Sequence, residues 1–138
     1  MSTIKVIYND CYGGFAFSEG FLAAFTERTG RTLNMDKELL FLGSKSIRCD
    51  AAAITLLEEK GAEWSSGANS YLAIREFPAV FANYWEIDEY DGNETVRITV
   101  AEALADVLDT YMETRDADAL ESQYAVLKEA QKALLKTA

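Results

Sequence analysis

The chain has 138 residues, 49% of them hydrophobic, which is enough to bury the core of one ordinary domain. Its formal charge of −10 argues against nucleic acid as a partner, because that binding uses Lys and Arg to neutralise phosphates. The absence of histidine excludes Ser-His-Asp and Cys-His catalysis and the usual zinc ligand sets.

The expected cellular compartment follows from the lack of a membrane-span pattern and of a secretory-signal pattern, and from the cysteine spacing. The sequence has no apolar run of about 18 residues and no basic start followed by an apolar segment, so neither a membrane span nor a secretory signal is expected. Cys11 and Cys49 are too far apart for a C-x-x-C metal or redox pair and are expected to be reduced thiols. We therefore expect a soluble, cytoplasmic protein.

The first half of the chain predicts one strand and two helices. The predicted elements are a strand over 4–8, a helix over 18–30, a short buried turn or strand over 39–42 and a helix over 50–61. Each helix begins at a residue suited to N-capping, Ser18 or Asp50, and ends at a glycine, Gly30 or Gly61.

The second half predicts strands followed by two long helices. The predicted elements are strands over 71–77 and 84–90, a helix over 99–111 and a last helix from Asp116 or Asp118 to Lys136. The two strands are expected to pair as an antiparallel hairpin. Thr99 and Glu102 have the spacing of a capping box.

Together these elements predict an α+β fold, in which a small, mainly antiparallel sheet is covered by helices and two helices stand at the C-terminal end. We expect a single domain over 1–138. Because one small sheet does not readily cover the apolar stripes of both C-terminal helices, a homo-oligomer, most simply a dimer, is expected.

A first motif, YNDCYGGF over 8–15, follows the first strand. Gly13 and Gly14 permit positive φ and close approach of a ligand, and the amides there are placed to cradle an anion before a helix. The alternative is a tight strand-to-helix turn in which Asn9 or Asp10 bonds the local backbone.

A second motif, EIDEYDGNE over 86–94, places carboxylates at Glu86, Asp88, Glu89, Asp91 and Glu94. Strand alternation puts Glu86 and Asp88 on one face with Tyr84 and Tyr90. Ca²⁺ or Mg²⁺ binding is one interpretation of such a cluster, but the EF-hand spacing is missing. A solvated acidic hairpin is favoured, and no metal or other cofactor is predicted.

Arg48 is the candidate cation between the two motifs. It suits a bidentate contact to the phosphate or carboxylate of a ligand, and an ion pair with Asp10 or Asp88 is the alternative. Two unusual motifs far apart in sequence are best explained by one shared site or network. We therefore expect the first turn and the acidic hairpin to lie together.

Both motifs, with an Arg-x-Asp at Arg48 and Asp50 before a Leu-rich acidic helix, resemble a family of small proteins encoded by bacteriophages, large DNA viruses and some bacterial genomes. The resemblance covers approximately 3–97 as an α+β core, and the helical pair over 99–138 lies outside it. Where the family commonly has His and Pro, this chain has Cys49 and Ala51, so any chemistry of that His is lost or replaced by a thiol.

The resemblance implies a virus-type accessory protein of the host cytoplasm that acts by binding. The leading hypothesis is counter-defence by sequestering a nucleotide-like signalling molecule, with ligand contacts from Asn9, Asp10, Tyr12, Gly13, Gly14, Arg48, Asp50 and Tyr90. One alternative is an acidic inhibitor that presents the carboxylates of 86–94 to a host protein, as a possible DNA mimic.

The other alternative is a small enzyme with Asp10, Asp88 or Glu89 as acid or base and Cys11 as nucleophile. Without histidine, Cys11 has no cationic neighbour to activate it unless Arg48 folds against it. Catalysis is therefore the less favoured class.

Overall fold

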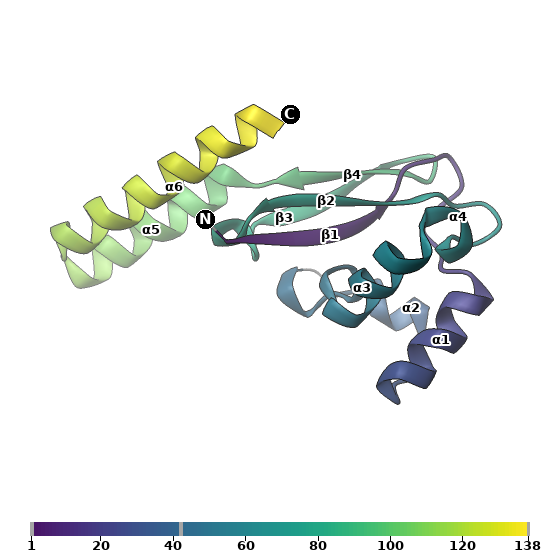
Figure 1. The fold of residues 1–138 in the computed structure, drawn as a ribbon. Helices are drawn as coiled ribbons and strands as arrows, with labels where there is room; N and C mark the ends of the chain where they lie inside the picture. The colour runs from purple at the N-terminus through teal and green to yellow at the C-terminus, as the bar shows by residue number, and fades with distance from the viewer. Residues whose placement is uncertain (1, 42, 138) are drawn as a thin grey trace.

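A computed structural model describes residues 2–41 and 43–137 and has the predicted α+β fold (Figure 1). β1 (Thr3–Asn9) pairs antiparallel with β2 (Leu72–Pro78), and β3 (Trp85–Tyr90) pairs antiparallel with β4 (Asn93–Ile98). In the described chain the strands thus form two two-stranded sheets.

The predicted pairing of β2 with β3 is wrong. A 3₁₀ turn, η3 (Ala79–Phe81), follows β2, and each strand takes another partner. β3 reverses instead through Asp91-Gly92, where φ is 51° and 84°. Positive φ at both central residues is the requirement of the type I′ turn, which Asp-Gly favours. The acidic motif is therefore the tip of a β3–β4 hairpin.

The helices lie in two groups along the chain. The first comprises α1 (Glu19–Thr29), α2 (Met35–Glu38), α3 (Ala51–Lys60) and α4 (Ala62–Ser65), with 3₁₀ turns η1 (Gly43–Lys45) and η2 (Ile47–Cys49) before α3. The second comprises α5 (Val100–Thr114) and α6 (Ala117–Thr137).

The predicted helix caps are largely confirmed. The Ser18 side chain accepts a bond from the Phe21 amide, and Asp50 accepts from the first turn of α3. Asp116 accepts from the Ala119 amide at 3.0 Å, which identifies it as the start of α6. The Thr99 capping box is wrong, because the Thr99 side chain makes no capping bond and its hydroxyl is buried without a partner.

The segment predicted as a buried turn or strand over 39–42 is also different. It follows the single turn of α2, and Leu40 and Phe41 are 79% and 52% exposed, because no element of the described chain covers them. Residue 42 lies outside the described residues.

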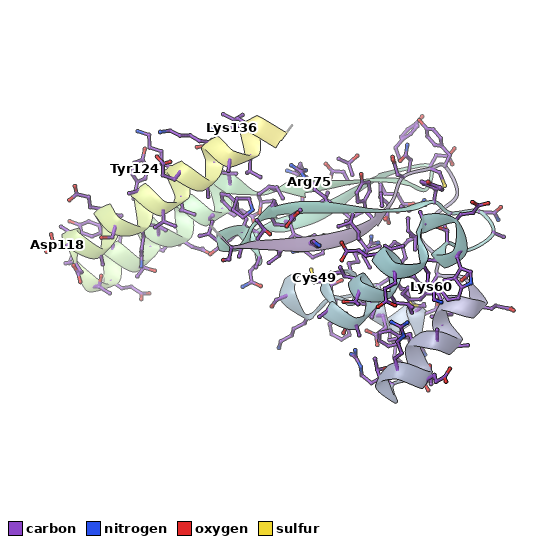
Figure 2. All side chains as sticks on the ribbon, viewed as in Figure 1. Cys49, Lys60, Arg75, Asp118, Tyr124 and Lys136 are labelled. Carbon is purple, nitrogen blue, oxygen red and sulfur yellow. The ribbon has the colours of Figure 1, made fainter. Side chains whose placement is uncertain are left out.

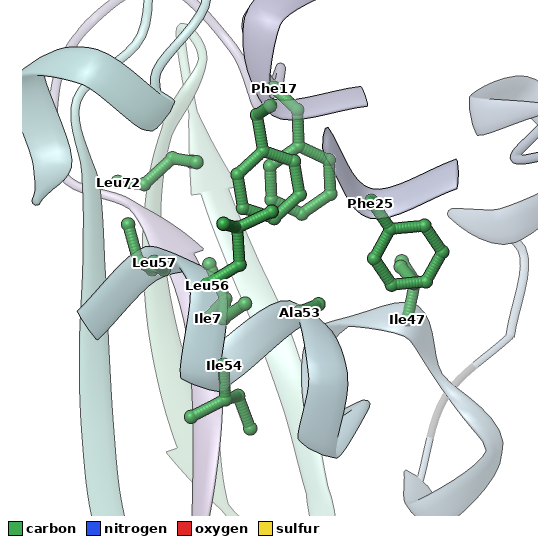
Figure 3. Packing of buried hydrophobic residues seen from close by; sticks show 10 residues of the cluster. Ile7, Phe17, Phe25, Ile47, Ala53, Ile54, Leu56, Leu57 and Leu72 are labelled. Carbon is green, nitrogen blue, oxygen red and sulfur yellow. The ribbon is translucent and has the colours of Figure 1, made fainter. Parts of the chain in front are cut away.

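The apolar core lies on both faces of β1. Successive side chains of a strand point to opposite faces, so Ile7 enters one cluster and Val6 the other. The Ile7 cluster packs α1, η2 and α3 against the sheet through residues such as Phe25 and Leu56 (Figure 3). The Val6 cluster joins β2, η3, β3 and β4 to the C-terminal helices through Leu127.

α5 and α6 pack against each other and extend beyond the sheet at the end opposite the β3–β4 turn (Figure 1). Leu127 and Ala130 anchor α6 in the core. Several large apolar side chains of the pair remain exposed, namely Leu108, Met112, Tyr124, Val126 and Leu135. None of the helices described is long and apolar enough to cross a membrane.

Candidate functional site

The two sequence motifs meet at the β3–β4 turn, as expected. A Cβ atom added to Gly92 would lie 2.5 Å from the Gly14 nitrogen and 2.8 Å from the Gly13 nitrogen. A Cβ on Gly13 would lie 1.6 Å from the Asn69 carbonyl oxygen. Three turns therefore converge so closely that two of them need glycine, and Gly92 packs against the amides that were expected to cradle an anion.

Arg48 is buried beside this junction and binds Glu94. Its Nη1 and Nη2 donate to Glu94 Oε1 and Oε2, each at 2.8 Å, in a bidentate pair. Nη1 also donates to the Ile7 carbonyl at 3.1 Å, and the guanidinium carbon lies 4.2 Å from the centre of the Phe15 ring. The expected partners Asp10 and Asp88 are replaced by Glu94.

Asn9 connects the pair to both turns. Its side-chain amide donates to the carbonyls of Cys11 and Gly92 at 2.8 Å, and its side-chain oxygen accepts from the Tyr71 amide at 2.8 Å. Its backbone amide donates to Glu94 Oε1 at 2.8 Å. We call these contacts the Asn9–Arg48–Glu94 network. The residues Asn9, Arg48 and Glu94 are 0%, 5% and 6% exposed, so this network holds the turns together from the protein interior.

The remaining predicted ligand residues divide into a cap and an exposed rim. Asp50 caps α3 and also pairs with Arg31 at 2.7 Å. Asp10, Tyr12 and Tyr90 are exposed around the junction. The eight predicted ligand residues therefore do not line one pocket.

The five acidic-motif residues differ in their surroundings. Glu86 and Asp88 both pair with Arg97 on β4, the latter at 2.9 Å, and Glu94 pairs with Arg48. Glu89 and Asp91 are exposed. Within the described residues, no group of three His, Cys, Asp or Glu side chains is placed to hold a metal ion.

A cavity of about 290 Å³ lies beside the network. It is lined by Phe15, Leu39, Arg48, Ile87, Glu89 and Glu94. The single guanidinium is already paired with Glu94, and Glu89 adds a second carboxylate. A phosphate in this cavity would therefore meet net negative charge.

The two thiols have different environments. Cys11 Sγ lies 3.4 Å from both Asn9 Oδ1 and the Asn69 carbonyl oxygen. Burial raises the pKa of the Cys49 thiol to about 11, against a smaller opposing effect of Arg48. Cys49 is therefore protonated at neutral pH and does not supply a thiolate nucleophile.

Asp88 and Glu89, two candidate acids or bases of the enzyme hypothesis, have different surroundings. Asp88 binds Arg97, whereas Glu89 faces the cavity with Arg48. Arg48 is committed to Glu94, so none of the contacts described places it against Cys11 as an activating cation.

Sequence reasoning named Asn9, Arg48 and Glu94 but did not recognise them as one network. The missing step was the reversal at Asp91-Gly92, which an Asp-Gly pair inside a strand-like run indicates.

No family model, curated protein or solved structure matches this chain.

Proposed function

We propose that the protein acts by binding another protein, and that its docking end is the exposed surface around the β3–β4 turn. The observation that carries this proposal is the contrast between the two layers of the junction. The buried Asn9–Arg48–Glu94 network fixes the turns, while Tyr12 and Tyr90 above it are 68% and 78% exposed. The resemblance to virus-encoded proteins makes a host protein, in a counter-defence role, the expected partner.

The chemistry of this docking end favours a basic partner surface. Tyrosine gives large contact area with few rotatable bonds, and for that reason it is enriched at interfaces. Asp10 lies two positions before Tyr12, and Glu89 and Asp91 flank Tyr90 in the sequence. All three are exposed and take no part in the ion pairs of the described chain. Unpaired exposed carboxylates steer a basic surface into contact and speed association.

Site-specific cross-linking tests the proposal. A photo-reactive amino acid is placed at position 12, 90 or 124 and irradiated in the host cell. Tyr124 is the matched control, because it is a tyrosine of 52% exposure on α6, at the other end of the molecule (Figure 2). We expect one host protein to be cross-linked from positions 12 and 90 and not from 124.

With that partner purified, binding is measured by calorimetry at two salt concentrations. Tyr12→Ser with Tyr90→Ser should weaken binding at least about tenfold, because interface tyrosines are frequent hot spots. Tyr124→Ser should leave it unchanged. Equal cross-linking from all three positions, or equal affinity of the two variants, would contradict the docking end.

Sequestration of a nucleotide-like molecule is the second candidate, supported by the Phe15 ring that lines the cavity of about 290 Å³ and opposed by the pairing of Arg48 with Glu94. A thermal-shift panel of cyclic and linear nucleotides tests it, since a ligand at about 100 times its Kd stabilises the fold by about 2.7 kcal/mol. No shift with any nucleotide at millimolar concentration would remove this candidate.

A further inference from the structure

An apolar groove lies between η3, α5 and α6. Figure 1 shows α5 and α6 at the end of the molecule away from the β3–β4 turn. Its volume is about 460 Å³, and its lining includes Val80, Tyr84, Asp106, Val107, Val126 and Leu127. Val80 and Val126 are 37% and 54% exposed, so the groove is open to solvent. Its open apolar lining is suited to an apolar side chain of another molecule.

A row of carboxylates on α5 reaches the groove at Asp106. Glu102, Asp106, Asp109 and Glu113 follow the spacing i, i+4, i+7, i+11, which places them on one face of the helix. All four are exposed, and the sequence of α5 contains no Lys or Arg. Asp106 both lines the groove and accepts a hydrogen bond from the Tyr84 hydroxyl at 2.6 Å, so the row meets the groove at this residue.

The row is unfavourable for the isolated helix. Like charges one turn apart repel each other, and Glu113 lies in the last turn, where the helix dipole favours a cation. No basic residue occupies that last turn. Glu102 suits the first turn of α5 and Asp106 binds the Tyr84 hydroxyl, but folding does not account for Asp109 and Glu113, whereas a cationic partner would neutralise them.

We propose that the groove binds a basic amphipathic helix of a partner protein, with apolar side chains in the groove and Lys or Arg along α5. Charge complementarity selects this occupant, because Lys and Arg would neutralise the carboxylates of α5, whereas α5 of a second copy carries the same carboxylates and no Lys or Arg. α5 has 15 residues and is about 22 Å long, which matches a partner helix of about four turns. The inference does not rest on the docking end, which lies at the other end of the molecule.

The probe is a synthetic amphipathic peptide of about 15 residues with leucines on one face and lysines on both flanks. One control peptide has glutamate for every lysine, and another has the same composition in an order without helical periodicity. Binding is followed by amide chemical shifts and fluorescence anisotropy. Only the basic amphipathic peptide should bind, with shifts at Val107, Thr110 and Val126, and salt should weaken it about tenfold between 50 and 500 mM.

Variants of the full chain locate the contact. Asp109→Lys with Glu113→Lys should weaken binding at least about tenfold, as should Val126→Lys, which blocks the apolar contact. Glu63→Lys with Glu121→Lys is the matched control, because it changes the net charge equally at exposed sites outside the groove lining. Thermal melts confirm that each variant is folded.

Three outcomes would overturn the inference. The first is that the basic and acidic peptides bind equally, or that neither binds at millimolar concentration. The second is that the Asp109→Lys, Glu113→Lys pair and the Glu63→Lys, Glu121→Lys pair weaken binding to the same extent. The third is that the groove resonances shift when the protein alone is diluted, which would identify a second copy as the occupant.

Discussion

Arg48 and Glu94 are nearly inaccessible to water, yet both carry charges that water would solvate well. Taking such charges out of water is costly, and here the cost is offset by the bidentate pair and by bonds to Ile7 and Asn9. Because each partner needs the other, the pair fixes the position of the hairpin on the first turn. Its main effect is to hold one arrangement of the turns.

Replacing one partner of the pair should therefore lower the free energy of unfolding more than replacing both with apolar residues. Arg48→Met should lower the free energy of unfolding by about 3–5 kcal/mol, because it leaves Glu94 buried without a counter-charge. Urea denaturation measures the loss. Arg48→Met with Glu94→Leu should recover part of it in a double-mutant cycle.

Arg31→Met is the control for this series. Its ion pair with Asp50 is more exposed, with 53% of the Arg31 side chain accessible, so its loss should cost less than about 1 kcal/mol. An Arg48→Met variant no less stable than Arg31→Met would contradict a stabilising role for the network.

Cys49 should make stability depend on alkaline pH. Burial raises the pKa of its thiol from 9.0 to about 11, so the folded state holds the proton more tightly than the unfolded state. The contribution is complete below about pH 9 and is lost as the pH rises to about 11. The melting temperature of the natural protein should therefore fall more steeply over this range than that of Cys49→Ala. Equal slopes would contradict it.

Sequence inspection found the residues of the network because their types are unusual in a turn, but not their partners. Arg48 and Glu94 are 46 positions apart, and nothing local distinguishes Glu94 from Asp10 or Asp88 as the acceptor. Glu94 is the acceptor because the chain reversal at Asp91-Gly92 places its side chain on the buried face of β4. Tertiary arrangement, and not residue type, decides which carboxylate is buried.

At the scale of elements, local signals were reliable and non-local ones were not. The ends of α1 and α3 depend on Ser18, Gly30 and Asp50, whose side chains or φ angles act within one turn. β2 pairs with β1, whose partner residues are 63 to 75 positions away in the sequence, from Asn9↔Leu72 to Thr3↔Pro78, whereas chain proximity wrongly favoured β3. β4 was missed because its charged residues conceal the alternation of Val96 and Ile98.

The acidic row of α5 leads to a prediction about stability. Glu113→Lys should stabilise the protein by about 0.3–1 kcal/mol, because it removes repulsion with Asp109 and places a cation in the last turn. Glu121→Lys, near the start of α6, is the control and should be neutral or destabilising. Calorimetric melts measure both. If Glu113→Lys were no more stable than the natural protein, the acidic row would not destabilise α5, and no functional reason for it would be needed.

At the scale of the whole molecule, the C-terminal helices share a core with the strands. Leu127 and Ala130 belong to the same buried cluster as Phe77, Phe81 and Trp85. A fragment ending at residue 98 should therefore expose these aromatic side chains and lose its cooperative unfolding transition. Denaturation of the fragment, followed by tryptophan fluorescence, tests this. Cooperative unfolding would instead support 3–97 as a self-sufficient core.

Dimerisation through the C-terminal helices stays a prediction, and the structure suggests which face to test. Tyr124 and Leu135 are 52% and 74% exposed and eleven residues apart, which brings them to nearly the same side of α6. Val126 in the groove lies on another side, about 200° from Tyr124. An interface on the Tyr124 face would therefore leave the groove open.

The charges of α6 favour an antiparallel pair. Carboxylates lie near its start and lysines near its end, and Figure 2 shows Asp118 and Lys136 at opposite ends with Tyr124 between them. Two such helices side by side in opposite directions would bring Glu121 of one copy near Lys132 of the other. The pairing would therefore be stronger at low salt.

Sedimentation equilibrium over a range of concentrations is the test. The natural protein should show a dimer that weakens with salt, and Tyr124→Glu with Leu135→Glu should be monomeric. Leu127 is unsuitable for this test because it is only 4% exposed, so a charge there would disrupt the core itself. Val126→Lys is the better control, since it changes an exposed apolar residue of α6 outside the tested face. A natural protein that stays monomeric at all concentrations, or a Tyr124 variant with unchanged mass, would show that α6 does not pair with itself.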